Sequence, residues 1–184
     1  MSGDRTRPPA DALDLRAHIV DLPDHPEPGV IFRDITPVLA HPEALASAVD
    51  QLTALTAELG VERVIAAEAR GFLLGPALAR ELGAGFLLAR KPGKLPRETI
   101  AVSYELEYGT DHLEVHADLL PPGTRVLVHD DLLATGGTAG ALCSLVERLG
   151  GEVVACSFLV ELGFLGGRAA LAPHDVHALV RYDS

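Results

Sequence analysis

Two adjacent aspartates followed by a turn of small residues form the stretch best suited to chemistry. In RVLVHDDLLATGGT (125–138), an apolar run leads into the aspartates, and ATGGT follows shortly after them. Glycine lets the backbone turn sharply, and the free N–H groups of a following helix attract anions, so ATGGT predicts a phosphate site. Two carboxylates repel each other in a plain turn, whereas ribose hydroxyls or a hydrated Mg²⁺ would use both. The predicted phosphate and sugar residues are Asp130, Asp131, Ala134, Thr135, Gly136, Gly137 and Thr138.

Other nucleotide-binding motifs are missing from the sequence. It contains neither GxxxxGK[ST] nor GxGxxG, which argues against a P-loop nucleotidase and against a dinucleotide-dependent dehydrogenase. For the glycine pair taken alone, a plain strand–turn–helix connection is the alternative interpretation.

Clustered basic residues indicate a ligand with several negative charges. The chain has 15 Lys and Arg and a net charge of −11, so a local cationic patch on it suits an anion such as pyrophosphate. In EARGF (68–72), Arg70 stands at a predicted strand end and would lie near the predicted phosphate site. The alternative interpretation is a surface arginine in a turn. The cluster RKPGKLPR contributes Arg90, Lys91, Lys94 and Arg97.

The order of predicted elements explains how these residues could meet. Continuous apolar strands alternate with helices, which predicts an α/β fold with an open, mainly parallel twisted sheet flanked by helices. Ligands bind beyond the carboxyl ends of such strands, so the three motifs should open on one edge of the sheet. A short amphipathic helix is expected at 13–20. The expected strands are 63–68, 83–90, 125–130, 152–162 and 176–182, and the other expected helices are 41–60, 72–82 and 138–150.

One domain is predicted over residues 13–184, after a loosely attached extension at 1–12. The segment 90–116 has Gly, Pro and charge in its first half and alternating apolar residues in its second, which is typical of a hairpin that acts as a flexible lid. Glu107 lies beside Tyr108 in this lid. A closed, dry site would raise the pKa of Glu107 toward that of a general base, and an exposed strand glutamate is the alternative.

Composition excludes several classes of protein. The acidic balance, with pI near 5.0, argues against a general nucleic-acid binder. The sequence shows no long apolar run and no signal-peptide core, so no membrane association and a cytoplasmic location are expected. Cys143 and Cys156 lack metal-ligand spacing and are expected to be buried hydrophobes, and no protein-ligated zinc is predicted.

From about Pro28 to the C-terminus, the sequence resembles the adenine phosphoribosyltransferase family. The strings RKPGKLPRET and LEYGTD are the most family-specific, whereas DDLLATGGT alone indicates the wider superfamily. The resemblance implies a type I phosphoribosyltransferase fold with a lid loop and a small N-terminal hood. It is carried by PGVIFRDITPVL (28–39), EARGFLLGPALA (68–79), RKPGKLPRETI (90–100), LEYGTDHLEVH (106–116) and VLVHDDLLATGGT (126–138).

The resemblance also implies an activity: transfer of a 5-phosphoribosyl group from phosphoribosyl pyrophosphate to N9 of adenine, giving AMP and pyrophosphate in purine salvage. It implies Mg²⁺ carried by substrate and water, and a homodimer in which Arg90 reaches the neighbouring subunit's pyrophosphate. Catalytic roles fall to Glu107, Tyr108 and Arg70. Pyrophosphate would be bound by Arg70, Arg90, Lys91 and Lys94, and adenine by Ile31, Phe32, Arg33 and Leu162.

Two rival functions share this fold. A purine-responsive repressor would keep the phosphoribosyl motif without catalysis, but it should carry a DNA-binding domain and a basic face. An enzyme for an oxopurine would differ near residues 31–33, where GVIFRD favours adenine. His129 departs from the family pattern of an aliphatic residue before the aspartates, and we expect it to be a core histidine with a hydrogen-bond partner.

Overall fold

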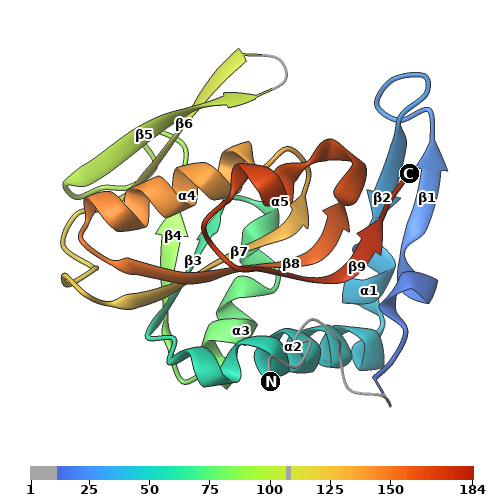
Figure 1. Cartoon of the computed structure of the whole chain (residues 1–184), viewed down its shortest axis with the longest axis horizontal. Coiled ribbons are helices and arrows are strands. Elements are labelled where there is room, and N and C mark those ends of the chain that lie inside the picture. The colour runs from blue at the N-terminus through green and yellow to red at the C-terminus, as the bar shows by residue number, and fades with distance from the viewer. Residues whose placement is uncertain (1–11, 107–108) are drawn as a thin grey trace.

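The computed structural model describes residues 12–106 and 109–184. Its centre is a parallel sheet with the strand order β4-β3-β7-β8-β9 (Figure 1). The chain starts at β3, adds β4 on one side and then β7 on the other. A crevice therefore forms beyond the carboxyl ends of β3 and β7, where the order reverses. The strands are β3 (Arg63–Ala67), β4 (Gly85–Ala89), β7 (Arg125–Leu133), β8 (Glu152–Leu162) and β9 (Val176–Tyr182).

Helices cover both faces of this sheet, as the sequence predicted (Figure 1). On one face lie α2 (Pro42–Thr56) and α3 (Gly75–Glu81), and on the other lie α4 (Gly137–Arg148) and α5 (Gly167–Ala170). In α2, Ala44, Ala48 and Leu52 recur every four residues and are fully buried against the sheet. The remaining helical segments are α1 (Thr36–Ala40), η1 (Leu15–His18), η2 (Ala57–Leu59), η3 (Arg70–Phe72) and η4 (Gly163–Leu165).

Two antiparallel hairpins extend from this core toward different ends of the molecule (Figure 1). The first joins β1 (Val20–Pro23) to β2 (Ile31–Asp34) and stands beside β9. The second joins β5 (Thr99–Leu106) to β6 (Gly109–His116) and packs on α4 through buried residues such as Val102 and Leu113. The hairpin expected in 90–116 is thus confirmed, and its action as a lid stays a prediction.

Two expectations about element boundaries were wrong. The helix expected at 13–20 is only the turn η1, because Val20 already pairs with Asp34 in the first hairpin. The strand expected to end at residue 130 continues to Leu133, because its backbone goes on pairing with β8 beyond the two aspartates. In the described part of the chain, no helix is both long and apolar enough to cross a membrane.

Candidate active site

The predicted phosphate loop connects the end of β7 to the start of α4. Gly136 has φ +91°, a left-handed conformation that side chains disfavour, and a Cβ there would lie 2.9 Å from the Gly167 carbonyl oxygen. Helix α4 begins at Gly137, so its first N–H groups have no partner within the helix. The geometry that the glycines were expected to provide is therefore present.

This loop forms one wall of a cleft of about 510 Å³ at the predicted edge of the sheet. The cleft brings together most of the residues assigned to phosphoribosyl pyrophosphate, although they come from three separate parts of the sequence. Its lining includes Arg70, Lys91, Asp130, Asp131 and all five residues of the loop 134–138, together with Glu68, Tyr104 and Asp111.

The two aspartates lie within β7 and share a tightly coupled environment. The Asp131 side chain is almost fully buried, and its Oδ2 lies 3.4 Å from Arg70 Nε. The Asp131 N–H donates to Asp130 Oδ1 at 3.0 Å. Burial, followed by the charge of Asp131, raises the pKa of Asp130, and burial also raises the pKa of Asp131. An uncharged ligand such as a sugar hydroxyl, or a cation, would relieve this repulsion.

The basic loop is held in place by Glu68, which the sequence reasoning did not single out. One Glu68 oxygen accepts from the Lys91 backbone N–H at 2.6 Å, and the other from Lys94 Nζ at 3.0 Å and from Arg90 at 3.2 Å. Burial alone would raise the pKa of Glu68, but these hydrogen bonds lower it to about 2. Glu68 is thus a permanent anion where several cations converge. Its position at the end of a predicted strand, ahead of a basic cluster, was the available signal.

Tyr104 on the β5–β6 hairpin lines the same cleft as the phosphate loop, and it too was missed. Burial raises the pKa of its hydroxyl. It also lies 3.5 Å from Asp111 Oδ2, which in turn pairs with Lys91 Nζ at 3.1 Å. Glu107 and Tyr108, the predicted lid residues, lie outside the described residues.

The residues assigned to adenine lie apart from the cleft lining that the structure describes. Ile31 and Phe32 stand on β2, with Ile31 exposed, while Leu162 ends β8. The Arg33 side chain is buried: its guanidinium lies 2.5 Å from Asp21 and 3.9 Å from the centre of the Tyr182 ring. The Arg33 side chain is thus engaged within the protein, and the part of Arg33 that meets adenine stays a prediction.

His129 is the buried core histidine that was expected. It is fully buried, and its Nδ1 lies 3.1 Å from Ser157 Oγ on the neighbouring strand. Burial lowers its pKa to about 4, so the ring is neutral at physiological pH. Cys143 and Cys156 are also buried, with sulfur atoms 3.7 Å apart.

The chain matches known proteins over most of its length. Residues 39–179 match the family described as phosphoribosyl transferase domain. An adenine phosphoribosyltransferase from Rubrobacter xylanophilus is 62% identical over 169 residues, covering 91% of this chain and 91% of that protein. The crystal structure of adenine phosphoribosyltransferase from Thermoanaerobacter pseudethanolicus has a TM-score of 0.88 and 48% identity, covering 91% of this chain and 98% of that chain. The chain belongs to the adenine phosphoribosyltransferase family.

Membership of the adenine phosphoribosyltransferase family establishes the chain as a pentosyltransferase of purine salvage. The Saccharomyces cerevisiae relative was solved with D-2,5-dideoxy-2,5-imino-altritol 1,6-bisphosphate and adenine. It has a TM-score of 0.84 and 37% identity, covering 89% of this chain and 95% of that chain. The expected type I phosphoribosyltransferase fold, with its parallel sheet and two extra hairpins, is confirmed.

Proposed function

We propose that the cleft binds phosphoribosyl pyrophosphate and transfers its phosphoribosyl group to N9 of adenine, giving AMP and pyrophosphate. The observation that carries this proposal is the meeting of a glycine-rich anion loop, two coupled carboxylates and basic side chains in one cleft. In this arrangement the loop 134–138 holds the 5-phosphate, and Asp130 and Asp131 accept from the ribose hydroxyls. Arg70, Lys91, Lys94 and Arg90 neutralise pyrophosphate.

Adenine would lie between the β1–β2 hairpin and the end of β8. Backbone groups at residues 31–33 would read the edge of the base, Phe32 would stack on one face, and Leu162 would close the other. Leu162 is half-buried, and Ile31 is exposed, which leaves apolar surface for a flat ring. A repressor function is disfavoured because the chain is acidic and is 62% identical to an adenine phosphoribosyltransferase over 91% of its length.

The carboxylate pair fits Mg²⁺ that arrives with the substrate. Asp131 Oδ2 is buried and lies 3.4 Å from Arg70 Nε, but among the described residues it accepts no hydrogen bond, so it can still accept one from a metal-bound water. Within residues 12–106 and 109–184, no group of three or more potential ligands could hold a metal by itself. Mg²⁺ usually keeps several waters and uses one or two carboxylates plus substrate phosphates. When bound, Mg²⁺ would neutralise negative charge on the leaving pyrophosphate.

In the proposed reaction, the bond from ribose C1 to pyrophosphate breaks through an oxocarbenium-like state, as in other glycosyl transfers. The basic loop stabilises charge as it grows on the pyrophosphate oxygen. Adenine N9 attacks C1 with inversion, and Glu107 accepts the N9 proton. The lid around Glu107 and Tyr108 excludes water, which would otherwise hydrolyse the activated sugar.

We also propose a homodimer that completes the pyrophosphate site. Leu88 on the edge strand β4 is 43% exposed, and Leu73, just after η3, is 47% exposed. Leu88 stands two residues before Arg90, which directly follows β4, so this strand carries exposed apolar surface close to Arg90. A partner covering this surface would be well placed to receive Arg90.

A cytoplasmic location completes the proposal. Cys143 and Cys156 are buried, and their sulfur atoms lie 3.7 Å apart. Thiols this close are kept reduced in the cytoplasm, whereas oxidising compartments favour disulfides.

Glu107→Gln tests the proposed mechanism. It should lower kcat by about 100-fold while KM for adenine changes little, because the carboxylate acts on the proton that leaves in the transition state. Glu98→Gln, an exposed glutamate in the same segment, is the matched control and should retain wild-type kinetics. Unchanged turnover for Glu107→Gln, under conditions where chemistry limits the rate, would remove the proposed base.

A further inference from the structure

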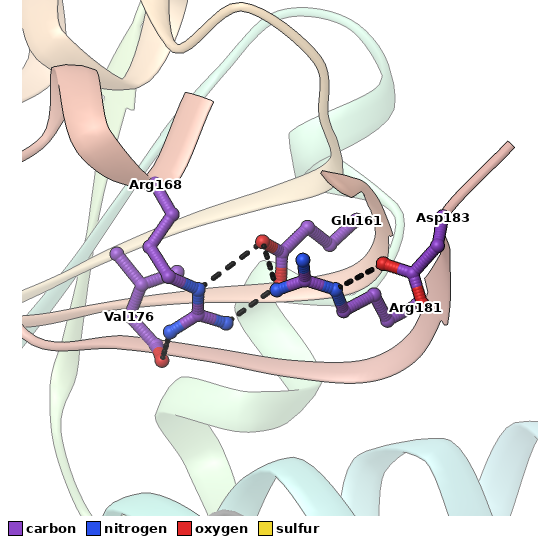
Figure 2. Close-up of polar contacts among 5 residues, drawn as sticks. All are labelled: Glu161, Arg168, Val176, Arg181 and Asp183. Atoms are coloured by element: carbon purple, nitrogen blue, oxygen red, sulfur yellow. Dashed lines mark hydrogen bonds and ion pairs between the residues drawn. The ribbon is translucent and has the colours of Figure 1, made fainter. Parts of the chain in front are cut away.

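A buried carboxylate at the end of β8 is held by two arginines (Figure 2). Glu161 is 2% exposed. Arg168 binds it with two hydrogen bonds, from Nε to Oε1 at 3.1 Å and from Nη2 to Oε2 at 2.6 Å. Arg181 on β9 adds a longer contact of 3.3 Å to Oε1. A bidentate arginine–carboxylate pair with one member fully buried fixes both position and orientation.

This pair closes the segment 162–167, because Glu161 lies immediately before it and Arg168 immediately after it. Arg168 also donates from Nη1 to the Val176 carbonyl at 2.5 Å, which ties the start of α5 to β9 as well (Figure 2). At Gly163, a Cβ would lie 2.7 Å from the Arg181 guanidinium, so the segment packs closely against this side chain too. The segment is therefore anchored at both of its ends.

The same segment rests directly on the phosphate loop. A Cβ on Gly167 would clash with the Ala134 carbonyl oxygen, and a Cβ on Gly136 would lie 2.9 Å from the Gly167 carbonyl oxygen. The two backbones thus touch with no side chain between them. A displacement of residues 167 and 168 must therefore be passed on to the loop 134–138.

We propose that Glu161 and Arg168 are positioning residues that set the distance between the adenine subsite and the 5-phosphate subsite. The inference rests on the proposed function, which places Leu162 against the base and residues 134–138 around the phosphate. Leu162 adjoins one member of the pair, and Gly167, on the phosphate loop, adjoins the other. A ligand that spans both subsites needs them at one fixed separation, whereas a ligand that fills only one subsite does not.

Arg168→Lys tests this role, because lysine keeps the charge but cannot form the bidentate contact. Dissociation constants would be measured by calorimetry for AMP, which spans both subsites, for ribose 5-phosphate, and for inorganic pyrophosphate. AMP should bind about tenfold more weakly than to the wild type, and ribose 5-phosphate at most about threefold more weakly. Pyrophosphate binding should not change, because it depends on the basic loop.

The matched control is Arg125→Lys. Arg125 is 41% exposed, close to the 40% of Arg168, and it also joins a carboxylate, Glu152, and a backbone carbonyl, that of Leu59. Arg125 begins β7, whereas the phosphate loop follows the other end of that strand. The Arg125→Lys variant should therefore bind all three ligands like the wild type. If Arg168→Lys fails to fold, Glu161→Gln replaces it, since glutamine keeps the volume of the buried side chain.

Two outcomes would overturn the proposal. The first is a dissociation constant for AMP in the variant that lies within twofold of the wild-type value. The second is a loss of affinity for AMP that is no greater than the loss of affinity for ribose 5-phosphate. The affinity of the wild-type protein for AMP reports separately on the proposed function, whereas the ratio between variant and wild type reports on Glu161 and Arg168.

Discussion

Replacing Asp130 by asparagine should stabilise the folded chain while it removes most of the activity. Burial and the neighbouring charge of Asp131 raise the pKa of Asp130 from 3.8 to about 8. The unfolded chain therefore releases this proton near pH 4, whereas the folded chain holds it until about pH 8. Because the folded state binds the extra proton in that window, the free energy of unfolding falls as pH rises through it. Asparagine cannot ionise, so the free energy of unfolding of the variant does not fall for this reason as the pH rises.

The size of the effect follows from the same geometry. A pKa difference of this kind would correspond to about 4 kcal/mol at pH 7, but Asp130 is partly open to the cleft and Arg70 offsets some of the repulsion. We expect a gain of about 1–2 kcal/mol, or about 3–6 °C in Tm. The bond from the Asp131 N–H survives, because the amide oxygen also accepts. Activity should fall roughly 100-fold, since asparagine offers the ribose hydroxyls one acceptor oxygen where the carboxyl group offers two.

Thermal unfolding of the ligand-free protein at pH 5, 6, 7 and 8 measures the stability gain of Asp130→Asn directly. The stability difference between Asp130→Asn and wild type should grow with pH across the series. Asp50→Asn, an exposed aspartate on α2, serves as the control and should track the wild type. A difference that stays constant from pH 5 to 8, or a variant less stable than wild type at pH 8, would refute the reasoning.

Three further predictions concern the anion site. Glu68→Gln should tighten inorganic pyrophosphate binding about fivefold in calorimetry, because one fewer negative charge competes for the basic loop; weaker binding would contradict this. Gly136→Ala should weaken ribose 5-phosphate binding at least about tenfold, because a side chain there meets Gly167 in a left-handed conformation, and unchanged affinity would count against the loop assignment. Mixing Arg90→Ala with Asp130→Asn chains should restore about a quarter of wild-type activity if Arg90 acts across a dimer, and none if it acts within its own subunit.

Much of the fold could be predicted from hydrophobic pattern alone. The inner parallel strands β3, β7 and β8 are largely buried and so appear as continuous apolar runs. Helices α2 and α4 show helical spacing, and a glycine follows the C-terminal end of each. The hydrophobic pattern failed to predict a strand boundary where charged side chains interrupt a strand whose backbone pairing continues. Strand β7 continues through Asp130 and Asp131 because its main chain still pairs with β8, which side-chain hydrophobicity does not reveal.

The phosphoribosyl half of the site could be predicted because its chemistry lies in contiguous motifs at strand ends. The proposed adenine half could not, because backbone groups of β2 carry no side-chain signature, and it was reached through the family resemblance alone. Glu68 and Glu161 were missed for a different reason. Each is a single acidic residue in or beside an apolar strand, and its role comes from arginines and lysines that only the fold brings near.

Nucleotide formation is the measurement that tests the central claim most directly. The protein would be incubated with Mg²⁺ and phosphoribosyl pyrophosphate, and with adenine, hypoxanthine, guanine or xanthine in separate reactions. The account predicts AMP and pyrophosphate in equal amounts from adenine, and little or no nucleotide from the three oxopurines. No AMP from adenine, or faster turnover of any oxopurine, would contradict it.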